Sequence, residues 1–361
     1  MMTRNRISAG GDVENATARS RAGKVGKISA KGGAGGLCAP STRSSGRRAL
    51  GELSTNTGAA RSGSADAAAA ESKSGVPNYL GACDTPAHVE PMAPFDAADA
   101  DDPLCVVEYV AEIYEHHFAT EAMRLPSPTY MNKQPDLNAK MRAILIDWLS
   151  EVNDKYRLRS ETLYLAVNLI DRFLASVAVD RKKLQLVGVT GLLLAAKYVE
   201  IYPPQLDELV RVSGRAYTRE EILSMEHKML AALGFHLSVP TPYVFLIRFL
   251  KAAGADAETA YRARYFLERG TLEYRMLKYI PSVMAASAVY MALRCRGDTG
   301  AEWTRNMARY TKCDEPALRP CVTEMTEIIN GAEKDSLQGV RRKYASSRFL
   351  RVALNPLPED L

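Results

Sequence analysis

The chain has 361 residues, of which 47% are hydrophobic and 25% charged, and its formal net charge is +5. This is enough apolar material for one large core or two smaller ones, and no run of about 18 apolar residues predicts a transmembrane helix. The first residues lack the basic start and apolar block of a secretory signal, so we expect an intracellular protein without a membrane partner.

The charge is unevenly distributed along the chain. Residues 1–75 hold 12 Lys and Arg against 5 Asp and Glu, whereas the remainder holds 35 against 37. A domain that binds nucleic acid usually carries its Lys and Arg clustered on the folded part, so we expect no direct nucleic-acid binding. The six cysteines form no C-x-x-C pair, and His116 and His117 have no partner at metal-ligand spacing. We therefore expect no metal and no cofactor.

Up to about residue 100 the sequence is rich in Gly, Ser, Ala and Pro and poor in aromatic residues. Such a segment cannot bury enough surface to offset its ordering entropy, so residues 1–100 are predicted to be a disordered basic tail. One denser island, RRALGELSTN, begins at Arg47 and contains Leu50 and Leu53. Without a local core to join, it indicates either a short linear motif read by a partner or a chance match.

From residue 101 the sequence changes to helices with readable ends. Asp102 before Pro103 predicts an N-terminal helix running to about Phe118, and an extended lead-in reaches residue 137. Residues 138–237 predict a first bundle of short-looped helices. Its five members are a helix capped by Asn138, one capped by Ser160, an apolar one over 184–199, a short one ending near 212, and one from the Thr218-x-x-Glu221 capping box to Gly234.

A second bundle is predicted for residues 238–335. In each half the third helix is the most apolar, GLLLAAKY in the first and PSVMAASAVYMAL in the second. The pattern indicates an all-α protein built from a duplicated five-helix unit, with a C-terminal extension over 336–361. The second set of helices is expected at 243–253, 256–275, 281–295, 302–310 and 315–330.

Read in order, the helices closely resemble those of the mitotic cyclins, from about Cys105 to Tyr344. The resemblance implies two cyclin boxes of five helices each behind an N-terminal helix. It also implies a protein without catalytic activity that binds and activates a cyclin-dependent protein kinase and controls G2/M progression. B-type cyclins are favoured by NLIDRFL and RRALGEL, while YMNKQPD leaves A-type as a near alternative. The motifs that carry the resemblance are MRAILIDWLSEV, ETLYLAVNLIDRFL, KLQLVGVTGLLLAAKYVEIYPP, AYTREEILSMEHKMLAALGF and SVPTPYVFLIRFLKAA.

The resemblance assigns kinase binding to Lys197 and Glu226, which match a lysine and a glutamate that hold the kinase backbone beside its αC helix. From the residues alone, Lys197 would be a helix-end lysine and Glu226 a solvated charge. Cyclins hold the αC helix and activation loop in the active arrangement, which shifts a two-state equilibrium. The same interface is expected to include Tyr198, Glu200 and Ile201, with Tyr109 and Ile113 from the N-terminal helix.

One stripe of the helix that follows Asn138 is apolar at helical spacing. Periodicity alone favours ordinary core for these side chains. By resemblance, the stripe forms a groove that binds Arg-x-Leu motifs of substrates and inhibitors, with an acidic and an amide side chain at its rim. The stripe consists of Met141, Ile144, Leu145 and Trp148, and the rim of Glu151 and Gln185.

Arg142 and Asp171 are charges within otherwise apolar helices, and the family pattern pairs them inside the first box. We expect a buried salt bridge with a structural role.

The island in the tail resembles the destruction box, R-x-x-L-x-x-x-x-N, which marks mitotic cyclins for ubiquitination by the anaphase-promoting complex. Arg47, Leu50 and Leu53 match, whereas Thr55 stands at the usual Asn position and Asn56 lies one place late. The resemblance implies ubiquitin-dependent degradation of a protein found in the nucleus and cytoplasm.

Two other classes of protein were weighed. A transcription factor of the IIB type also duplicates the cyclin fold, but it would need a basic folded surface and commonly a zinc ribbon. An enzyme is disfavoured because no nucleophile and base pair, phosphate loop or metal cluster can be assembled from the sequence.

Overall fold

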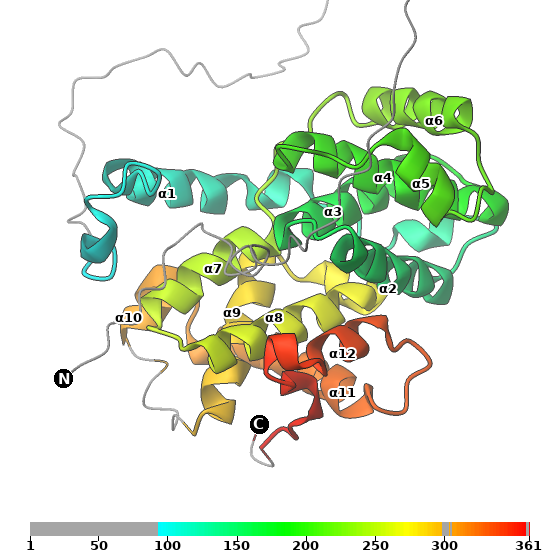
Figure 1. Cartoon of the computed structure of the whole chain (residues 1–361). Coiled ribbons are helices and arrows are strands. Elements are labelled where there is room, and N and C mark those ends of the chain that lie inside the picture. Colours follow the sequence, from blue (N-terminus) through cyan, green and yellow to red (C-terminus); the bar gives the residue numbers. More distant parts are fainter. Residues whose placement is uncertain (1–92, 298–302, 304, 359–360) are drawn as a thin grey trace, which may run out of the picture. The chain divides into compact units, whose positions relative to one another are not determined.

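The computed structural model describes residues 93–297, 303, 305–358 and 361. Every regular element within these residues is an α-helix or a 3-10 helix (Figure 1). The prediction of an all-α protein is therefore confirmed. The motif at Arg47, Leu50 and Leu53 lies outside the described residues.

The first bundle surrounds a buried central helix, α4. This helix packs against α2, α3 and α6, and its side chains from Leu186 to Ala196 are all buried. A helix that is apolar all round must be enclosed in this way. The bundle consists of α2 (Ala139–Lys155), α3 (Ser160–Ser176), α4 (Leu184–Val199), α5 (Leu206–Val212) and α6 (Arg219–Ala232).

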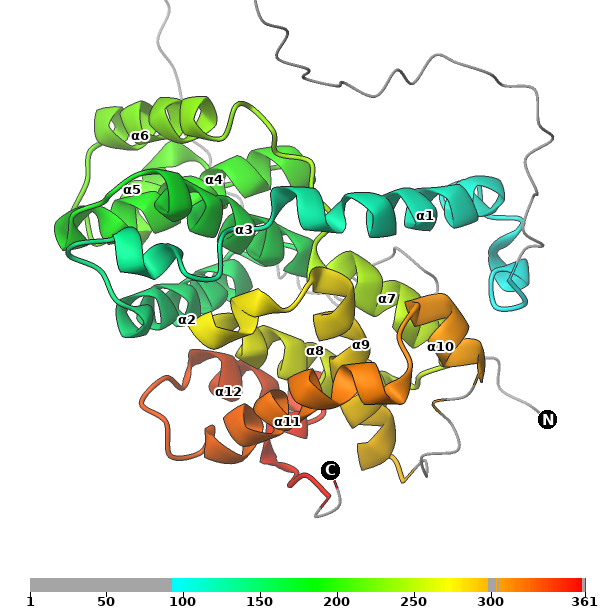
Figure 2. The ribbon, with the colours of Figure 1, turned by 180° about the vertical axis from the view of Figure 1, so that it is seen from behind.

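The second bundle repeats this plan around α9, which packs against α7, α8 and α11. Figures 1 and 2 show its helices gathered on the side of α2 and α3 away from α6. The predicted duplication of a unit with a buried third helix agrees with this arrangement. The bundle consists of α7 (Pro242–Ala252), α8 (Ala257–Leu272), α9 (Pro281–Cys295), α10 (Arg305–Thr311) and α11 (Glu315–Gly331).

Two glycines let α4 approach its neighbours closely. A Cβ added at Gly188 would lie 2.6 Å from the Cδ1 atom of Leu145, and one at Gly191 would lie 2.6 Å from the Cγ1 atom of Ile170. Both distances are far below van der Waals contact, so alanine at either position would displace the Leu145 or the Ile170 side chain.

Two predicted helix starts have the expected caps. The Asn138 Oδ1 atom accepts a hydrogen bond from the Met141 N–H at 3.0 Å. Thr218 and Glu221 form a reciprocal capping box at the start of α6. Each cap satisfies backbone donors that the first turn of a helix leaves unpaired.

Two other predicted starts are wrong. The N-terminal helix α1 spans Val110–Thr120, because Val106 adopts a left-handed conformation with φ of 46° and interrupts the run. Asp102 instead accepts a hydrogen bond from the Leu104 N–H within a turn. Ser160 is the first residue of α3 rather than its cap. The cap comes from the end of α4, where Glu200 Oε1 accepts hydrogen bonds from Arg159 N at 2.7 Å and Thr162 Oγ1 at 2.5 Å.

The folded part begins before residue 100, so the predicted boundary of the tail is too late. Residues 97–99 form a short 3-10 helix, and the neighbouring Asp96 is 2% exposed. Its Oδ1 atom accepts hydrogen bonds from Arg248 at 2.7 Å and Lys251 at 2.6 Å, both on α7. Two cations from a distant helix order a segment whose composition predicts disorder.

The C-terminal extension is also part of the fold. It forms α12 (Gly339–Tyr344) and two 3-10 helices, Ser347–Phe349 and Val352–Leu354. Helix α12 packs against α2 of the first bundle and α8 of the second (Figure 1). This helix was not predicted from the sequence.

A buried network links the two bundles. Arg142 and Asp171 form a bidentate ion pair with both distances at 2.7 Å, and each side chain is 1% exposed. Asp171 also accepts a hydrogen bond from the Tyr130 hydroxyl at 2.8 Å. The remaining Arg142 nitrogen donates to the carbonyl oxygens of Thr271 and Leu272, at 3.2 and 3.1 Å, at the end of α8. The guanidinium thus joins the bundles as well as α2 and α3.

A second polar contact between the bundles involves Glu161, at the start of α3. Its Oε1 atom accepts a hydrogen bond from the Thr241 hydroxyl at 2.7 Å, next to α7. Its Oε2 atom is buried and has no hydrogen-bond partner among the described residues. Burial raises the pKa of Glu161 to about 7, although the Thr241 hydroxyl acts against the shift.

Glu161 should make stability depend on pH. In the unfolded chain the Glu161 carboxyl has a pKa of 4.5, whereas in the folded protein its pKa is about 7. Between about pH 4.5 and 7 the folded protein therefore binds a proton that the unfolded chain does not. The free energy of unfolding should therefore fall as pH rises through this window. Glu161→Gln keeps the acceptor for Thr241 and removes the titration. At about pH 8 the variant should be more stable than the wild type by about 1–2 kcal/mol, with no gain near pH 4.

Urea denaturation of the full chain across this pH range measures the effect. Glu112→Gln, on the exposed surface of α1, is the matched control and should follow the wild type. Equal pH dependence in the wild type and Glu161→Gln would contradict the prediction.

Candidate functional site

The first candidate site lies where the end of α4 meets α6. The Lys197 Nζ atom lies 2.6 Å from the Glu226 Oε1 atom, and the side chains are 46% and 12% exposed. The packing of α4 against α6 brings together these two residues, which the sequence analysis singled out. The pair is open to solvent on one side and can therefore be reached by a partner.

Exposed apolar side chains lie on the same two segments of the chain as this ion pair. Tyr198 and Ile201, both expected here, are 53% and 77% exposed. Tyr202 and Phe235 are 90% and 69% exposed, and Leu223 lies one helical turn before Glu226 on α6. Neighbouring exposed apolar residues mark interaction surfaces. Tyr202, Phe235 and Leu223 were not predicted from the sequence, although Leu223 lies three residues before Glu226, at the spacing of neighbours on one helix face.

Glu200, expected in the same interface, makes hydrogen bonds within the first bundle. Both of its described hydrogen bonds go to the first turn of α3, so its carboxylate holds α3 against the end of α4. Tyr109 and Ile113 are 51% and 41% exposed. Ile113 lies one turn after Tyr109, so the two side chains share one face at the start of α1.

The apolar stripe of α2 is divided between surface and core. Ile144 is 48% exposed, whereas Leu145 is 5% exposed and fills the space above Gly188. Met141 and Trp148 are partly buried and pack against the core. Leu145 therefore supports the stripe from below, and the other three side chains form its accessible part.

The two expected rim residues lie in different surroundings. Gln185 is half-buried near the start of α4. Glu151 follows Trp148 by three residues and Ile144 by seven, so it extends the same stripe. Its Oε1 atom forms an ion pair with the Arg342 Nη2 atom of α12. This ion-pair partner was not predicted from the sequence.

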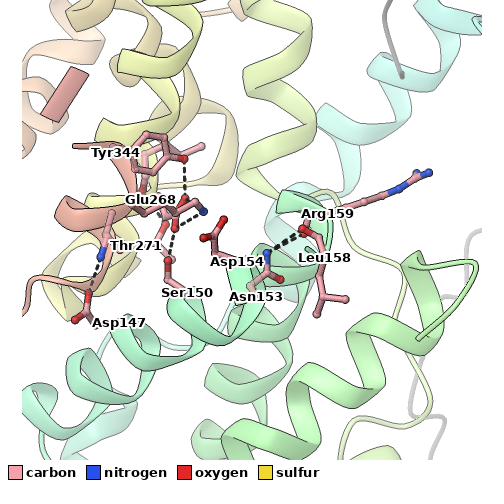
Figure 3. Close-up of polar contacts among 12 residues, drawn as sticks. Asp147, Ser150, Asn153, Asp154, Leu158, Arg159, Glu268, Thr271 and Tyr344 are labelled. Carbon is pink, nitrogen blue, oxygen red and sulfur yellow. Dashed lines mark hydrogen bonds and ion pairs between the residues drawn. The ribbon is translucent and has the colours of Figure 1, made fainter. Parts of the chain in front are cut away.

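Beside the stripe, a buried carboxylate joins three helices (Figure 3). Glu268 of α8 accepts hydrogen bonds from the Ser150 hydroxyl of α2 at 2.5 Å and from the Tyr344 hydroxyl of α12 at 2.7 Å. The Lys343 Nζ atom lies 2.9 Å from both of its oxygens. Ser150 and Glu268 are 0% and 1% exposed. The position of α12 is thus fixed by a fully hydrogen-bonded charge.

The part of the chain that the structure describes contains no group of three or more His, Cys, Asp or Glu side chains that could hold a metal ion. None of its helices is long and apolar enough to cross a membrane. Among the described residues, the cysteines Cys295, Cys313 and Cys321 are free thiols.

Two family models match the chain, the cyclin N-terminal domain over residues 112–238 and the cyclin C-terminal domain over residues 240–358. Cyclin-B2-1 of Oryza sativa subsp. japonica is 46% identical over 260 residues, which cover 72% of this chain and 62% of the rice protein. G2/mitotic-specific cyclin-2 of Medicago sativa is 45% identical over 260 residues, which cover 72% of this chain and 79% of that protein. The chain belongs to the cyclin family.

This cyclin is of the G2/mitotic B type, so the preference for B-type over A-type is confirmed. Cyclins are non-catalytic regulatory subunits. A viral cyclin from herpesvirus saimiri shares the fold with a TM-score of 0.52 and 18% sequence identity, over 58% of this cyclin and 94% of the viral chain. The matched region of this chain spans less than two thirds of the length of the rice cyclin-B2-1.

Proposed function

We propose that this cyclin binds a cyclin-dependent protein kinase through the face around Lys197 and Glu226, and activates it at the G2/M transition. The observation that carries the proposal is the accessible ion pair between the two residues, with the exposed Tyr198, Ile201 and Tyr202 within five residues of Lys197 along the chain. Exposed aromatic and aliphatic side chains are typical of protein interfaces, which are enriched in Tyr and other aromatic residues.

The mechanism follows from what a kinase needs. Its αC glutamate must pair with the phosphate-binding lysine, and its activation loop must be ordered. This cyclin supplies surface instead of a reacting group, and it acts by binding the kinase better in the active arrangement. Moving such an equilibrium from about 1:99 to 99:1 takes roughly 5.5 kcal/mol of differential binding. An interface with several exposed aromatic and aliphatic anchors can supply this free energy.

The test is the addition of the full chain to a purified, inactive cyclin-dependent kinase, followed by measurement of peptide phosphorylation. Phosphorylation should depend on the added cyclin. Binding to promoter DNA without kinase activation would instead favour the alternative of a transcription factor of the IIB type. The acidic balance of residues 76–361, with 35 basic against 37 acidic residues, speaks against that alternative.

We further propose that Met141, Ile144 and Trp148 form a groove for Arg-x-Leu motifs of substrates and inhibitors, supported from below by Leu145. The exposed Ile144 and the partly buried Trp148 offer an apolar surface for the ligand leucine. Glu151, at the end of this stripe, offers a carboxylate for the ligand arginine, and charge-assisted hydrogen bonds of this kind are strong.

Trp148→Ala should weaken the binding of an Arg-x-Leu peptide by about 2 kcal/mol or more, because aromatic anchors carry much of the energy of such contacts. Kinase activation should be retained, since Lys197 lies on α4. Fluorescence anisotropy with a labelled peptide measures docking, and a kinase assay on the same samples is the control. A variant that loses its fold instead would indicate that Trp148 serves the core.

The tail residues Arg47, Leu50 and Leu53 are proposed as a destruction box read by the anaphase-promoting complex, in a protein that acts in the nucleus and cytoplasm. The sequence alone supports this part of the proposal.

A further inference from the structure

We propose that Arg342 controls how strongly the peptide groove selects arginine, by holding the Glu151 carboxylate until a ligand arginine displaces it. This inference rests on the proposed groove. The ion pair joins Glu151 of α2 to Arg342 of α12, and these two residues lie 191 positions apart in the sequence. The Arg342 and Glu151 side chains are 71% and 44% exposed, so a ligand can reach both.

Helix α12 is fixed at its start by α2. The Asp147 carboxylate accepts hydrogen bonds from the backbone N–H groups of Gly339 at 2.9 Å and Val340 at 3.0 Å. A Cβ added at Gly339 would lie 2.9 Å from the carboxylate carbon of Asp147, so the close approach requires glycine. These bonds satisfy donors that a helix start leaves unpaired, and they place the first turn of α12 directly on α2.

The end of α12 is fixed as well. Lys343 and Tyr344 both bind Glu268, which also binds Ser150 of α2; Figure 3 shows Ser150 and Tyr344 converging on this carboxylate. Arg342 lies between the two anchored ends. The backbone of Arg342 is therefore held by a rigid support from which the guanidinium reaches Glu151.

The pair and the ligand compete for one carboxylate. Glu151 continues the stripe of Ile144 and Trp148, so a ligand arginine beside these residues would meet the same oxygens as Arg342. Two guanidinium groups on one carboxylate bring like charges together, which raises the free energy of the complex. A ligand with arginine must therefore displace Arg342, whereas a ligand with a neutral residue at that position leaves the pair intact.

The test uses the full chain and a labelled Arg-x-Leu peptide, with fluorescence anisotropy at low salt. Arg342→Gln should tighten binding of this peptide by about two- to five-fold, the range expected when an exposed ion pair no longer competes. Binding of the matching Ala-x-Leu peptide should not change. In a Glu151→Gln background, Arg342→Gln should have no effect, because the shared carboxylate is gone.

Arg341→Gln is the matched control. It makes the same change in net charge on the neighbouring residue, which pairs with Glu333 at 3.6 Å instead of Glu151, and it should leave peptide affinity at the wild-type value. An equal gain from Arg341→Gln would overturn the inference by showing a general charge effect. Unchanged or weaker peptide binding by Arg342→Gln, in an assay in which Trp148→Ala weakens docking, would also overturn the inference. Absence of peptide binding in the wild type and every variant would overturn the groove itself and the inference with it.

Discussion

Replacing Arg142 by alanine should lower the free energy of unfolding by about 3–5 kcal/mol, because it leaves a buried charge without its partner. Asp171 would keep only the Tyr130 hydroxyl in a site where it is 1% exposed. The carbonyl oxygens of Thr271 and Leu272 would lose the donor that ties the second bundle to the first. Both effects act on the folded state, so the loss should be comparable to that of truncating a large core side chain.

Urea denaturation monitored by circular dichroism measures this loss. Arg219→Ala is the matched control, because its ion pair with Asp207 is 51% and 62% exposed and should contribute only about 0–1 kcal/mol. Arg142→Met combined with Asp171→Asn should recover part of the lost stability, since no unpaired charge then remains buried. Unchanged stability of Arg142→Ala would refute the structural role of the pair.

The double variant Lys197→Ala, Glu226→Ala should weaken association with the kinase by about 2–5 kcal/mol, as expected when hydrogen-bonded charges are removed from a buried interface. In the free protein the Lys197 side chain is 46% exposed, so its ion pair adds little to stability. Binding and folding are therefore expected to separate in this variant.

A pull-down with the purified kinase and a phosphorylation assay measure binding and activation, and a thermal melt of the same protein checks the fold. The variant Arg219→Ala, Asp207→Ala is the matched control. It removes an exposed ion pair of the same 2.6 Å length from the same bundle, and kinase binding should be retained. Full kinase binding by the Lys197 and Glu226 variant would contradict the proposed interface.

The sequence by itself determined the helices and most of their ends. The expected bounds of α4 and α9 agree with Leu184–Val199 and Pro281–Cys295, because an apolar run ended by polar residues or proline is a local signal. The caps at Asn138 and Thr218 are equally local, since a cap bonds to a backbone group within three residues. The motifs on these helices were also enough to indicate the family.

Only the tertiary structure decided which surface each side chain joins. Leu145 and the neighbouring Ile144 belong to the same apolar run, yet one lies under the stripe and the other on it, because α4 approaches at Gly188. Glu200 caps a helix that begins 40 residues earlier in the chain. Asp96 is ordered by two cations of α7.

The same limit applies to the C-terminal helix. Nothing local to the sequence of α12 indicates that Arg342 reaches Glu151, or that Glu268 of α8 accepts hydrogen bonds from both α2 and α12. Helical periodicity tells which side chains share a face, but not which distant element covers that face. Long-range packing fixes that choice, and here it places the C-terminal helix beside the proposed peptide groove.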